Sequence, residues 1–226
     1  MKQYKELVIE TAGLKPLLRG WLHAAAAISA LPLTAAMCWY NQADQPRMYS
    51  LLVFALSTIS LYAVSAIYHI GSWRGFWLRL WRTFDHANIF VAIAAGYTPI
   101  CFNLLRGWQR EVIMNVIWLM ATLGVALCIF NSRLPRWMRT SLYLGMGWVS
   151  LFVIPLICQV LPWQAVASLL IVGLLYSTGA FVYAMRWPDP FPRVFGFHEL
   201  FHLLVVVSSL IYIGVIWFWI LPFPRL

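Results

Sequence analysis

Long apolar stretches fill most of this chain, and short polar or proline-containing turns separate them. The stretches have the approximate bounds 18–40, 48–70, 84–104, 112–130, 141–161, 164–185 and 198–221. A helix needs about 20 mostly apolar residues to cross a bilayer, and each stretch is about that long. The pattern therefore predicts an all-α membrane protein, in which residues 1–226 form a single domain built as a bundle of seven transmembrane helices.

The division between the fifth and sixth stretches depends on one short turn, Leu161-Pro162-Trp163. Without that turn, the two stretches would form one helix of about 45 residues, which is longer than helix tilt accommodates in a bilayer. We therefore expect the chain to reverse direction at Pro162.

The composition supports a membrane protein and excludes several other classes. Hydrophobic residues make up 62% of the chain, charged residues make up 10%, and the mean hydropathy is +0.78. Soluble domains carry about 25% charged residues, so neither a soluble globular domain nor a disordered chain is expected. The net charge of +9 would suit a nucleic-acid surface, but membrane proteins also collect cations in their cytoplasmic loops. We expect no nucleic-acid partner.

The positions of the cations predict how the helices are oriented. If the N-terminus is cytoplasmic, that side of the membrane receives 12 of the 16 cations and the opposite side receives 4. The positive-inside rule then places the N-terminus inside and the C-terminus outside. This is the reverse of the orientation usual for G-protein-coupled receptors. The cytoplasmic set is Lys2, Lys5, Lys15, Arg19, Arg74, Arg79, Arg82, Arg133, Arg136, Arg139, Arg186 and Arg193, and the outer set is Arg47, Arg106, Arg110 and Arg225.

The short termini and loops fit a bacterial inner-membrane protein, and no cleavable signal peptide is expected. The first 17 residues carry mixed charge, and the apolar stretch after them is too long for a signal peptide. The first 15 residues are predicted to form a surface helix with Leu7, Val8 and Leu14 toward lipid. Cys38, Cys101, Cys128 and Cys158 each stand alone in apolar surroundings, so we interpret them as packing residues.

Ionisable residues inside the spans are few, and such residues usually mark a functional site because burying them in a bilayer is costly. In the predicted orientation, four of them share one depth near the cytoplasmic face: His69 ends the second span, Asp85 starts the third, and His198 and His202 start the seventh. They form one site if these three spans are neighbours. His23 and His86, taken singly, fit packed and hydrogen-bonded histidines better.

Among them, His69, His198 and His202 match the ligand set of a catalytic zinc site. His198 and His202 are four residues apart, which places both imidazoles on one helix face, and His69 adds a third nitrogen. Three neutral imidazoles with an open fourth position hold Zn²⁺ in hydrolytic enzymes. Asp85 is then the candidate proton acceptor, and Ser65, four residues before His69, is a candidate oxyanion donor.

Residues 198–202 also read H-E-x-x-H, the helix signature of metalloproteases in which the glutamate is the base. An intramembrane metalloprotease therefore stays open as an alternative. It would give the catalytic role to Glu199 and make Asp85 or His69 the third ligand.

Five segments of the chain, considered together and in this order, resemble the hemolysin III family. They are 15–20 (KPLLRG), 65–69 (SAIYH), 84–89 (FDHANI), 96–99 (GYTP) and 195–202 (FGFHELFH). That family is grouped with the progestin and adipoQ receptors, in a superfamily that includes the alkaline ceramidases and shares an S-x3-H, D, H-x3-H signature. One departure is Ala95-Gly96, where a Gly-Thr pair is expected before Tyr-Thr-Pro.

The resemblance implies a seven-helix fold with a cytoplasmic N-terminus. It further implies zinc held by His69, His198 and His202, with Asp85 reaching the ion through water and Ser65 nearby. It argues against Glu199 as the base, because the receptor relatives tolerate other residues between the two histidines.

Two functions follow as expectations. The first is a zinc-dependent hydrolase of a lipid amide or ester, of the ceramidase kind, with a membrane lipid as substrate. The second is a non-enzymatic, receptor-like or membrane-homeostasis protein in which zinc is structural. A cytolytic pore is less favoured, because no span carries a stripe of charge that would line a channel.

Overall fold

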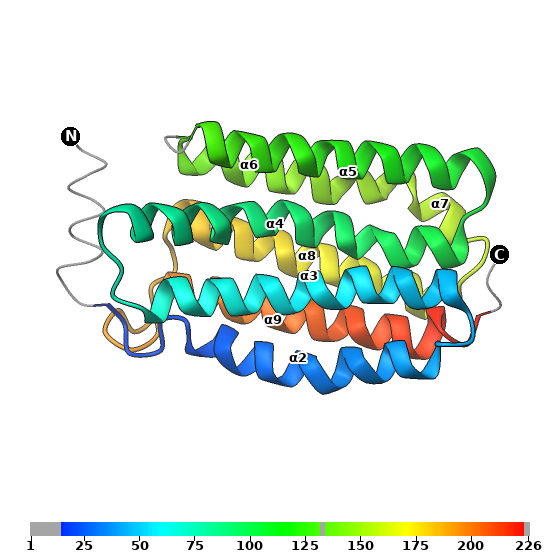
Figure 1. Ribbon diagram of the computed structural model, residues 1–226, viewed down its shortest axis with the longest axis horizontal. Coiled ribbons are helices and arrows are strands. Elements are labelled where there is room, and N and C mark those ends of the chain that lie inside the picture. Colours follow the sequence, from blue (N-terminus) through cyan, green and yellow to red (C-terminus); the bar gives the residue numbers. More distant parts are fainter. Residues whose placement is uncertain (1–14, 132–133, 224–226) are drawn as a thin grey trace.

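The computed structural model describes residues 15–131 and 134–223, and it confirms the all-α fold and the seven predicted spans. Seven helical segments are long and apolar enough to cross a membrane, and they run side by side along the bundle (Figure 1). The elements are α2 (Trp21–Tyr40), α3 (Gln45–Ile70), α4 (Gly75–Leu104), α5 (Gly107–Phe130), α6 (Arg136–Trp148), η1 (Val149–Phe152), α7 (Ile154–Ile157), α8 (Trp163–Met185), α9 (Phe197–Val215) and η2 (Ile216–Ile220). The predicted surface helix at Leu7, Val8 and Leu14 falls outside the described residues.

The third helix begins earlier than its apolar stretch. Hydropathy places the start near residue 84, whereas α4 begins at Gly75. Its first turns carry exposed Trp77 and Arg79, residues that suit the interface between bilayer and water. Backbone hydrogen bonding therefore continues beyond the apolar stretch, and Asp85 lies in the interior of a helix instead of at its start.

The fifth span is broken rather than continuous. It consists of α6, the 3₁₀ turn η1 and the short α7, with Pro155 in the first turn of α7. Backbone carbonyls released by such a break need partners inside a bilayer. The Tyr97 hydroxyl of α4 supplies one by donating to the carbonyl oxygens of Met146 at 3.1 Å and Gly147 at 2.6 Å. The chain reverses between α7 and α8, as the Leu161-Pro162-Trp163 turn predicts.

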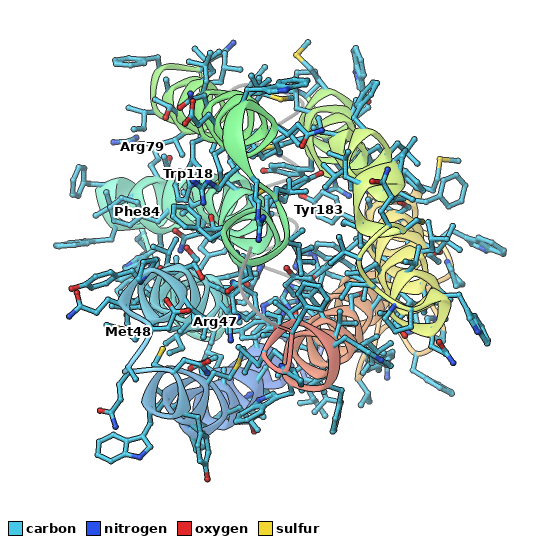
Figure 2. The ribbon with its side chains drawn as sticks, turned by 90° about the vertical axis from the view of Figure 1, so that its right-hand side faces the viewer. Arg47, Met48, Arg79, Phe84, Trp118 and Tyr183 are labelled. Carbon is cyan, nitrogen blue, oxygen red and sulfur yellow. The ribbon has the colours of Figure 1, made fainter. Side chains whose placement is uncertain are left out.

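Helix α4 is the most buried of the seven spans. Figure 2, which looks along the helices, shows it surrounded by the others. It packs against α3, α5 and α6, while α9 packs against α2 and α8. Because α2 also packs against α3, the first, second, third and seventh spans are brought together. These are the spans that carry the predicted site.

One end of the bundle is fastened by Arg47, which is labelled in Figure 2. Its Nε donates to Oδ1 of Asn103 at 2.8 Å, and its two terminal nitrogens donate to the carbonyl oxygens of Leu221 at 2.9 Å and Phe223 at 2.7 Å. These contacts join α3 and α4 to the chain just after η2.

The opposite end is fastened by the segment 15–20 that precedes the first span. The amides of Leu17 and Leu18 donate to the carbonyl oxygens of Arg193 at 3.1 Å and Val194 at 3.2 Å. Lys15 Nζ donates to the carbonyl oxygen of Ile70 at 3.3 Å. This segment therefore lies against the loop before α9 and the end of α3.

Candidate metal centre

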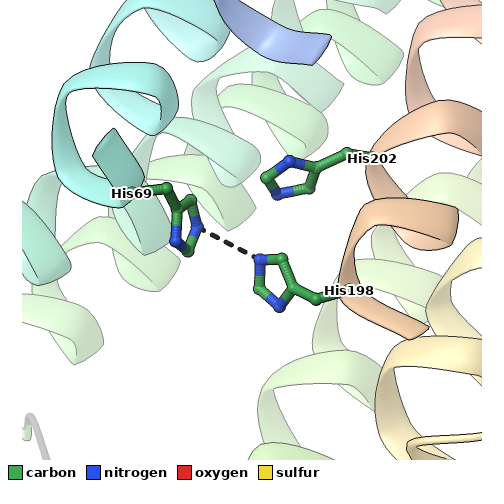
Figure 3. Close-up of side chains that lie close together, drawn as sticks. All are labelled: His69, His198 and His202. Carbon is green, nitrogen blue, oxygen red and sulfur yellow. Dashed lines mark hydrogen bonds between the residues drawn. The ribbon is translucent and has the colours of Figure 1, made fainter. Parts of the chain in front are cut away.

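Three histidines from two helices meet near the end of the bundle that carries segment 15–20 (Figure 3). His69 lies in the last turn of α3, and His198 and His202 lie in the first two turns of α9. The spacing of four residues in α9 directs both imidazoles to one face, and their ring centroids are 4.5 Å apart. The Nε2 atoms of His198 and His69 are 3.1 Å apart. We refer to these three residues as the histidine cluster.

The histidine cluster fits a metal ion. One nitrogen from each ring can be chosen such that all three lie within 4.8 Å of one another, and all three residues are buried. Tetrahedral zinc with bonds of about 2.0–2.1 Å places its ligand atoms about 3.3 Å apart, close to the observed separation of His69 and His198. In addition, Nδ1 of His202 is buried and has no hydrogen-bond partner among the described residues. Three imidazoles, one with a buried and unpartnered nitrogen, could hold a metal ion.

Asp85 and Ser65 lie beside the histidine cluster. The Oδ2 atom of Asp85, which α4 positions, is 3.8 Å from Nε2 of His69. Ser65 is one turn before His69 on α3, and its hydroxyl is in hydrogen-bonding contact with the Asp85 side chain. Both residues are buried. The structure thus brings together the five residues that the sequence singles out, from three helices.

His23 also lies against the cluster. Its ring stacks on that of His202 with a centroid distance of 3.8 Å and an interplanar angle of 8°. It comes from α2 and is 3% exposed. Both ring nitrogens of His23 are also buried without a hydrogen-bond partner among the described residues, but His23 is not among the residues whose ligand atoms lie within 4.8 Å of one another. We therefore assign it to support of the His202 ring.

Glu199 is fully buried and is not among the candidate ligand residues. One carboxylate oxygen accepts a hydrogen bond from the backbone amide of Gly196 at 2.8 Å, which caps the first turn of α9. The other accepts from Nε of Arg19 and forms a buried ion pair. Desolvation, together with the positive charge of Arg19, lowers the pKa of Lys15 on the same segment. Glu199 thus anchors the helix that carries two of the three histidines.

His86 follows Asp85 on α4 and meets Arg139 from the first turn of α6. A terminal nitrogen of Arg139 donates to Nδ1 of His86 at 2.8 Å, so this ring nitrogen is an unprotonated acceptor. The backbone oxygen of His86 accepts from the Tyr143 hydroxyl at 2.9 Å. His86 therefore belongs to a contact between α4 and α6 and not to the histidine cluster.

The histidine cluster opens into a cavity of about 940 Å³. Asp85, Ser65 and all three histidines line it, and it continues between the helices to Phe54, Ile100 and other apolar side chains. Both Asp85 and Ile100 line it, and the stretch of α4 between them rises about 22 Å. The cavity is therefore long, and its walls become apolar away from the cluster.

Sequence reasoning missed two features of this region. The first is the ion pair between Arg19 and Glu199, and the second is the contact between Arg139 and His86. The capping position of Glu199, three residues after Gly196, is a recognisable signal for its structural role. No local signal distinguishes Arg139 from the cytoplasmic cations around it, because its burial depends on which helices are neighbours.

The fold and the site define a class: a seven-span membrane protein with a buried histidine cluster near one membrane face. Comparison with known proteins agrees with that class. A family model described as "Haemolysin-III related" matches residues 12–213. This chain therefore belongs to the haemolysin III family, which the sequence motifs predict.

Individual relatives come from bacteria, plants and animals. The chain is 31% identical to Hemolysin-3 of Bacillus cereus over 145 residues, which cover 64% of this chain and 63% of that protein, less than two thirds of its length. It is 26% identical to a Hemolysin-3 homolog of Bacillus subtilis over 160 residues, covering 71% of this chain and 72% of the relative. It is 26% identical to the adiponectin receptor protein of Drosophila melanogaster over 152 residues, which cover 59% of this chain and 34% of that protein.

Proposed function

We propose that this protein is a zinc-dependent hydrolase of a membrane lipid that carries an acyl amide or acyl ester. The observation that carries the proposal is that the histidine cluster and Asp85 line a large cavity instead of lying in a closed core. Structural zinc sites have all four positions filled by protein, whereas catalytic sites leave one position open to water and substrate. The three histidines account for three positions, and the cavity leaves room at the fourth.

The shape and lining of the cavity support a lipid substrate. The cluster lies near the end of the bundle, where a lipid headgroup meets water, and the cavity then continues past apolar side chains. A substrate with its reacting carbonyl beside the cluster and its hydrocarbon chain along α4 would match both parts of the cavity. The chain length of about 22 Å available along α4 suits a long acyl group.

Each residue of the site has a separate role in the proposed hydrolysis. When bound to the histidine cluster, zinc would supply a Lewis acid and a water molecule with a pKa of about 7. The Asp85 carboxylate, 3.8 Å from His69, is placed to accept a proton and later to return it to the leaving group. The Ser65 hydroxyl interacts with the Asp85 side chain, and because it lines the same cavity it is a candidate donor to a developing oxyanion. Arg19 and Glu199 hold α9 in position.

The test is to incubate the purified protein, with its bound metal, with a panel of acyl-amide and acyl-ester lipids and to measure released fatty acid. Replacing Asp85 with Asn should lower turnover about 10²- to 10⁴-fold, the usual contribution of a general base, while the bound metal is retained. Asp44→Asn is the matched control, because Asp44 lies at the other end of the bundle, before α3, and Asn also serves as a helix N-cap.

The outcomes separate the hydrolase from the structural alternative. Release of fatty acid by the parent and the Asp44→Asn variant, but not by Asp85→Asn, supports the hydrolase. If the parent releases none, or if Asp85→Asn keeps its metal and releases as much as the parent, the hydrolase proposal is wrong. Removal of the metal that lowers the melting temperature, without turnover of any lipid, would favour structural zinc.

A further inference from the structure

Arg139 is a buried cation for which the structure provides little compensation. It is 7% exposed, it lines the cavity, and its Nε has no hydrogen-bond partner among the described residues. Its partner through a terminal nitrogen is Nδ1 of His86, which accepts a hydrogen bond but carries no negative charge. The Asp85 carboxylate offsets part of the Arg139 charge, but no carboxylate of the described residues forms an ion pair with Arg139, and burying such a guanidinium group is costly. An anion bound in the cavity would offset the free-energy cost of burying the Arg139 guanidinium group.

Basic side chains outnumber acidic ones on the cavity wall. Six basic side chains line it, whereas among the described lining residues Asp85 is the single acid. Glu199 compensates one of the six, Arg19. The basic residues are Lys15, Arg19, Arg74, Arg82, Arg136 and Arg139. A concave surface with this sign of charge attracts anionic ligands and repels cationic ones.

The geometry places this positive region beside the proposed reaction site. His86, which holds Arg139, directly follows Asp85 in α4, and Asp85 lies 3.8 Å from His69. Arg136 lies one turn before Arg139 on α6 and stacks over the Tyr183 ring at 4.7 Å from its centroid. The start of α6, whose backbone amides favour negative charge, is at the same place.

We propose that Arg139, supported by His86 and Arg82, binds the phosphate of an anionic lipid headgroup and so restricts the protein to acyl lipids that carry one. The inference rests on the proposed function, because it names the substrate class of the same cavity. The phosphate would lie at the rim against Arg139, the acyl carbonyl beside the histidine cluster, and the hydrocarbon chain in the apolar part of the cavity. Charge-assisted hydrogen bonds from Arg139 would then distinguish phosphate-bearing lipids from neutral lipids with the same chain.

Binding of a matched, non-hydrolysable pair of lipids tests the inference without depending on turnover. The pair is an 18-carbon alkyl-glycerol 3-phosphate and the same alkyl-glycerol without phosphate, both ether-linked, titrated into the purified full-length protein in detergent by calorimetry. We expect the phosphate form to bind about 10- to 100-fold more tightly, the range for hydrogen bonds to a charged group. Equal affinity of the two lipids would overturn the inference.

Variants then test whether Arg139 causes the tighter binding of the phosphate-bearing lipid. Arg139→Gln should abolish it, whereas Arg106→Gln, which removes an exposed arginine before α5 that does not line the cavity, should keep it. Arg82→Gln removes a half-buried arginine of the same rim and should lower the preference about two- to fivefold, which keeps the test decisive if Arg139→Gln does not fold. A preference that survives in both Arg139→Gln and Arg82→Gln would show that the phosphate binds elsewhere.

Two further measurements separate the alternatives. Inorganic phosphate that binds as tightly as the alkyl-glycerol phosphate would show that free phosphate, not a lipid, is the ligand, and would overturn the inference. The ester-linked versions of the two lipids are then compared for release of fatty acid. Phosphate-dependent binding without release means that the headgroup site exists and the hydrolase proposal fails. Equal release from both esters means that the hydrolase proposal holds and the headgroup inference fails.

Discussion

Four imidazoles lie within stacking or hydrogen-bonding distance of one another around α3 and α9, yet the geometry assigns them different roles. His69, His198 and His202 offer ligand atoms within 4.8 Å of one another. His23 presents the face of its ring to His202 at 3.8 Å. A histidine that orients a ligand ring contributes less to metal affinity than a ligand does.

Metal content should follow this division. We expect His69→Ala, His198→Ala and His202→Ala each to lose the bound metal, because a site with two protein ligands binds zinc weakly. His23→Ala should retain it. The measurement is the ratio of metal to protein by inductively coupled plasma mass spectrometry after purification. Loss of metal from His23→Ala as complete as from His69→Ala would make His23 a ligand and contradict the assignment.

The buried pair of Arg19 and Glu199 should matter for stability rather than for chemistry. Glu199→Gln leaves the guanidinium of Arg19 without its counter-ion, and breaking such a buried pair costs about 3–5 kcal/mol. We expect a clear fall in melting temperature, measured by intrinsic tryptophan fluorescence, with the metal still bound at low temperature.

Glu111→Gln is the control for this change, because Glu111 is exposed on α5 and its substitution should alter the free energy of unfolding by less than about 0.5 kcal/mol. A Glu199→Gln variant that melts like the parent but loses all turnover would contradict the structural role. It would instead favour the metalloprotease reading of residues 198–202.

At the level of helices, the contact between α4 and α5 depends on a glycine. A Cβ atom added at Gly124 would lie 2.3 Å from the Phe90 ring, and Phe90 is buried in the core. Gly124 therefore allows the innermost helix to approach α5 closely, as small residues do at helix contacts in membranes.

Gly124→Ala should destabilise the bundle by about 1–3 kcal/mol, the cost of overpacking a filled core. Gly145→Ala, on an exposed position of α6 where an added Cβ meets open space, should be neutral or stabilise by up to about 1 kcal/mol through helix propensity. Thermal melts of both variants in the same detergent provide the comparison. The reverse order of stability would show that Phe90 moves aside without cost.

Helix ends and helix breaks were the parts of the fold that hydropathy predicted least well. The start of α4 lies at Gly75, well before the apolar stretch, because aromatic and cationic residues at the interface continue the helix. The break between α6 and α7 was not predicted either. Hydropathy measures transfer into lipid and not backbone geometry, so a 3₁₀ turn with Pro155 after it leaves the apolar pattern unchanged.

For the molecule as a whole, the number of spans and the depth of the site could be predicted because both follow from one-dimensional patterns. Each span is apolar for about 20 residues, and His69, Asp85, His198 and His202 each stand out in such a span. Contacts such as that of Arg139 with His86 could not be predicted. They depend on α4 and α6 being neighbours in space, and no spacing in the chain encodes that.

The orientation of the bundle in the membrane remains a prediction of the cation count. With 12 of the 16 cations on one side, we expect a cytoplasmic N-terminus, a C-terminus outside, and the histidine cluster near the cytoplasmic leaflet. A green fluorescent protein fused to the N-terminus should fluoresce, and alkaline phosphatase fused to the C-terminus should be active in a bacterial host. The opposite pair of results would reverse the predicted orientation and place the histidine cluster near the outer leaflet.

The segment that precedes the first span changes where this protein effectively begins. The first transmembrane helix starts at Trp21. Before it, Arg19 forms an ion pair with Glu199, and the amides of Leu17 and Leu18 donate to the loop before α9. A truncation that removed residues 15–20 would keep every span and could still insert into a membrane. It would also strand a buried carboxylate beside the two histidines of α9. The residue at which membrane insertion begins and the residue from which the histidine cluster is supported are therefore different, and the second lies upstream.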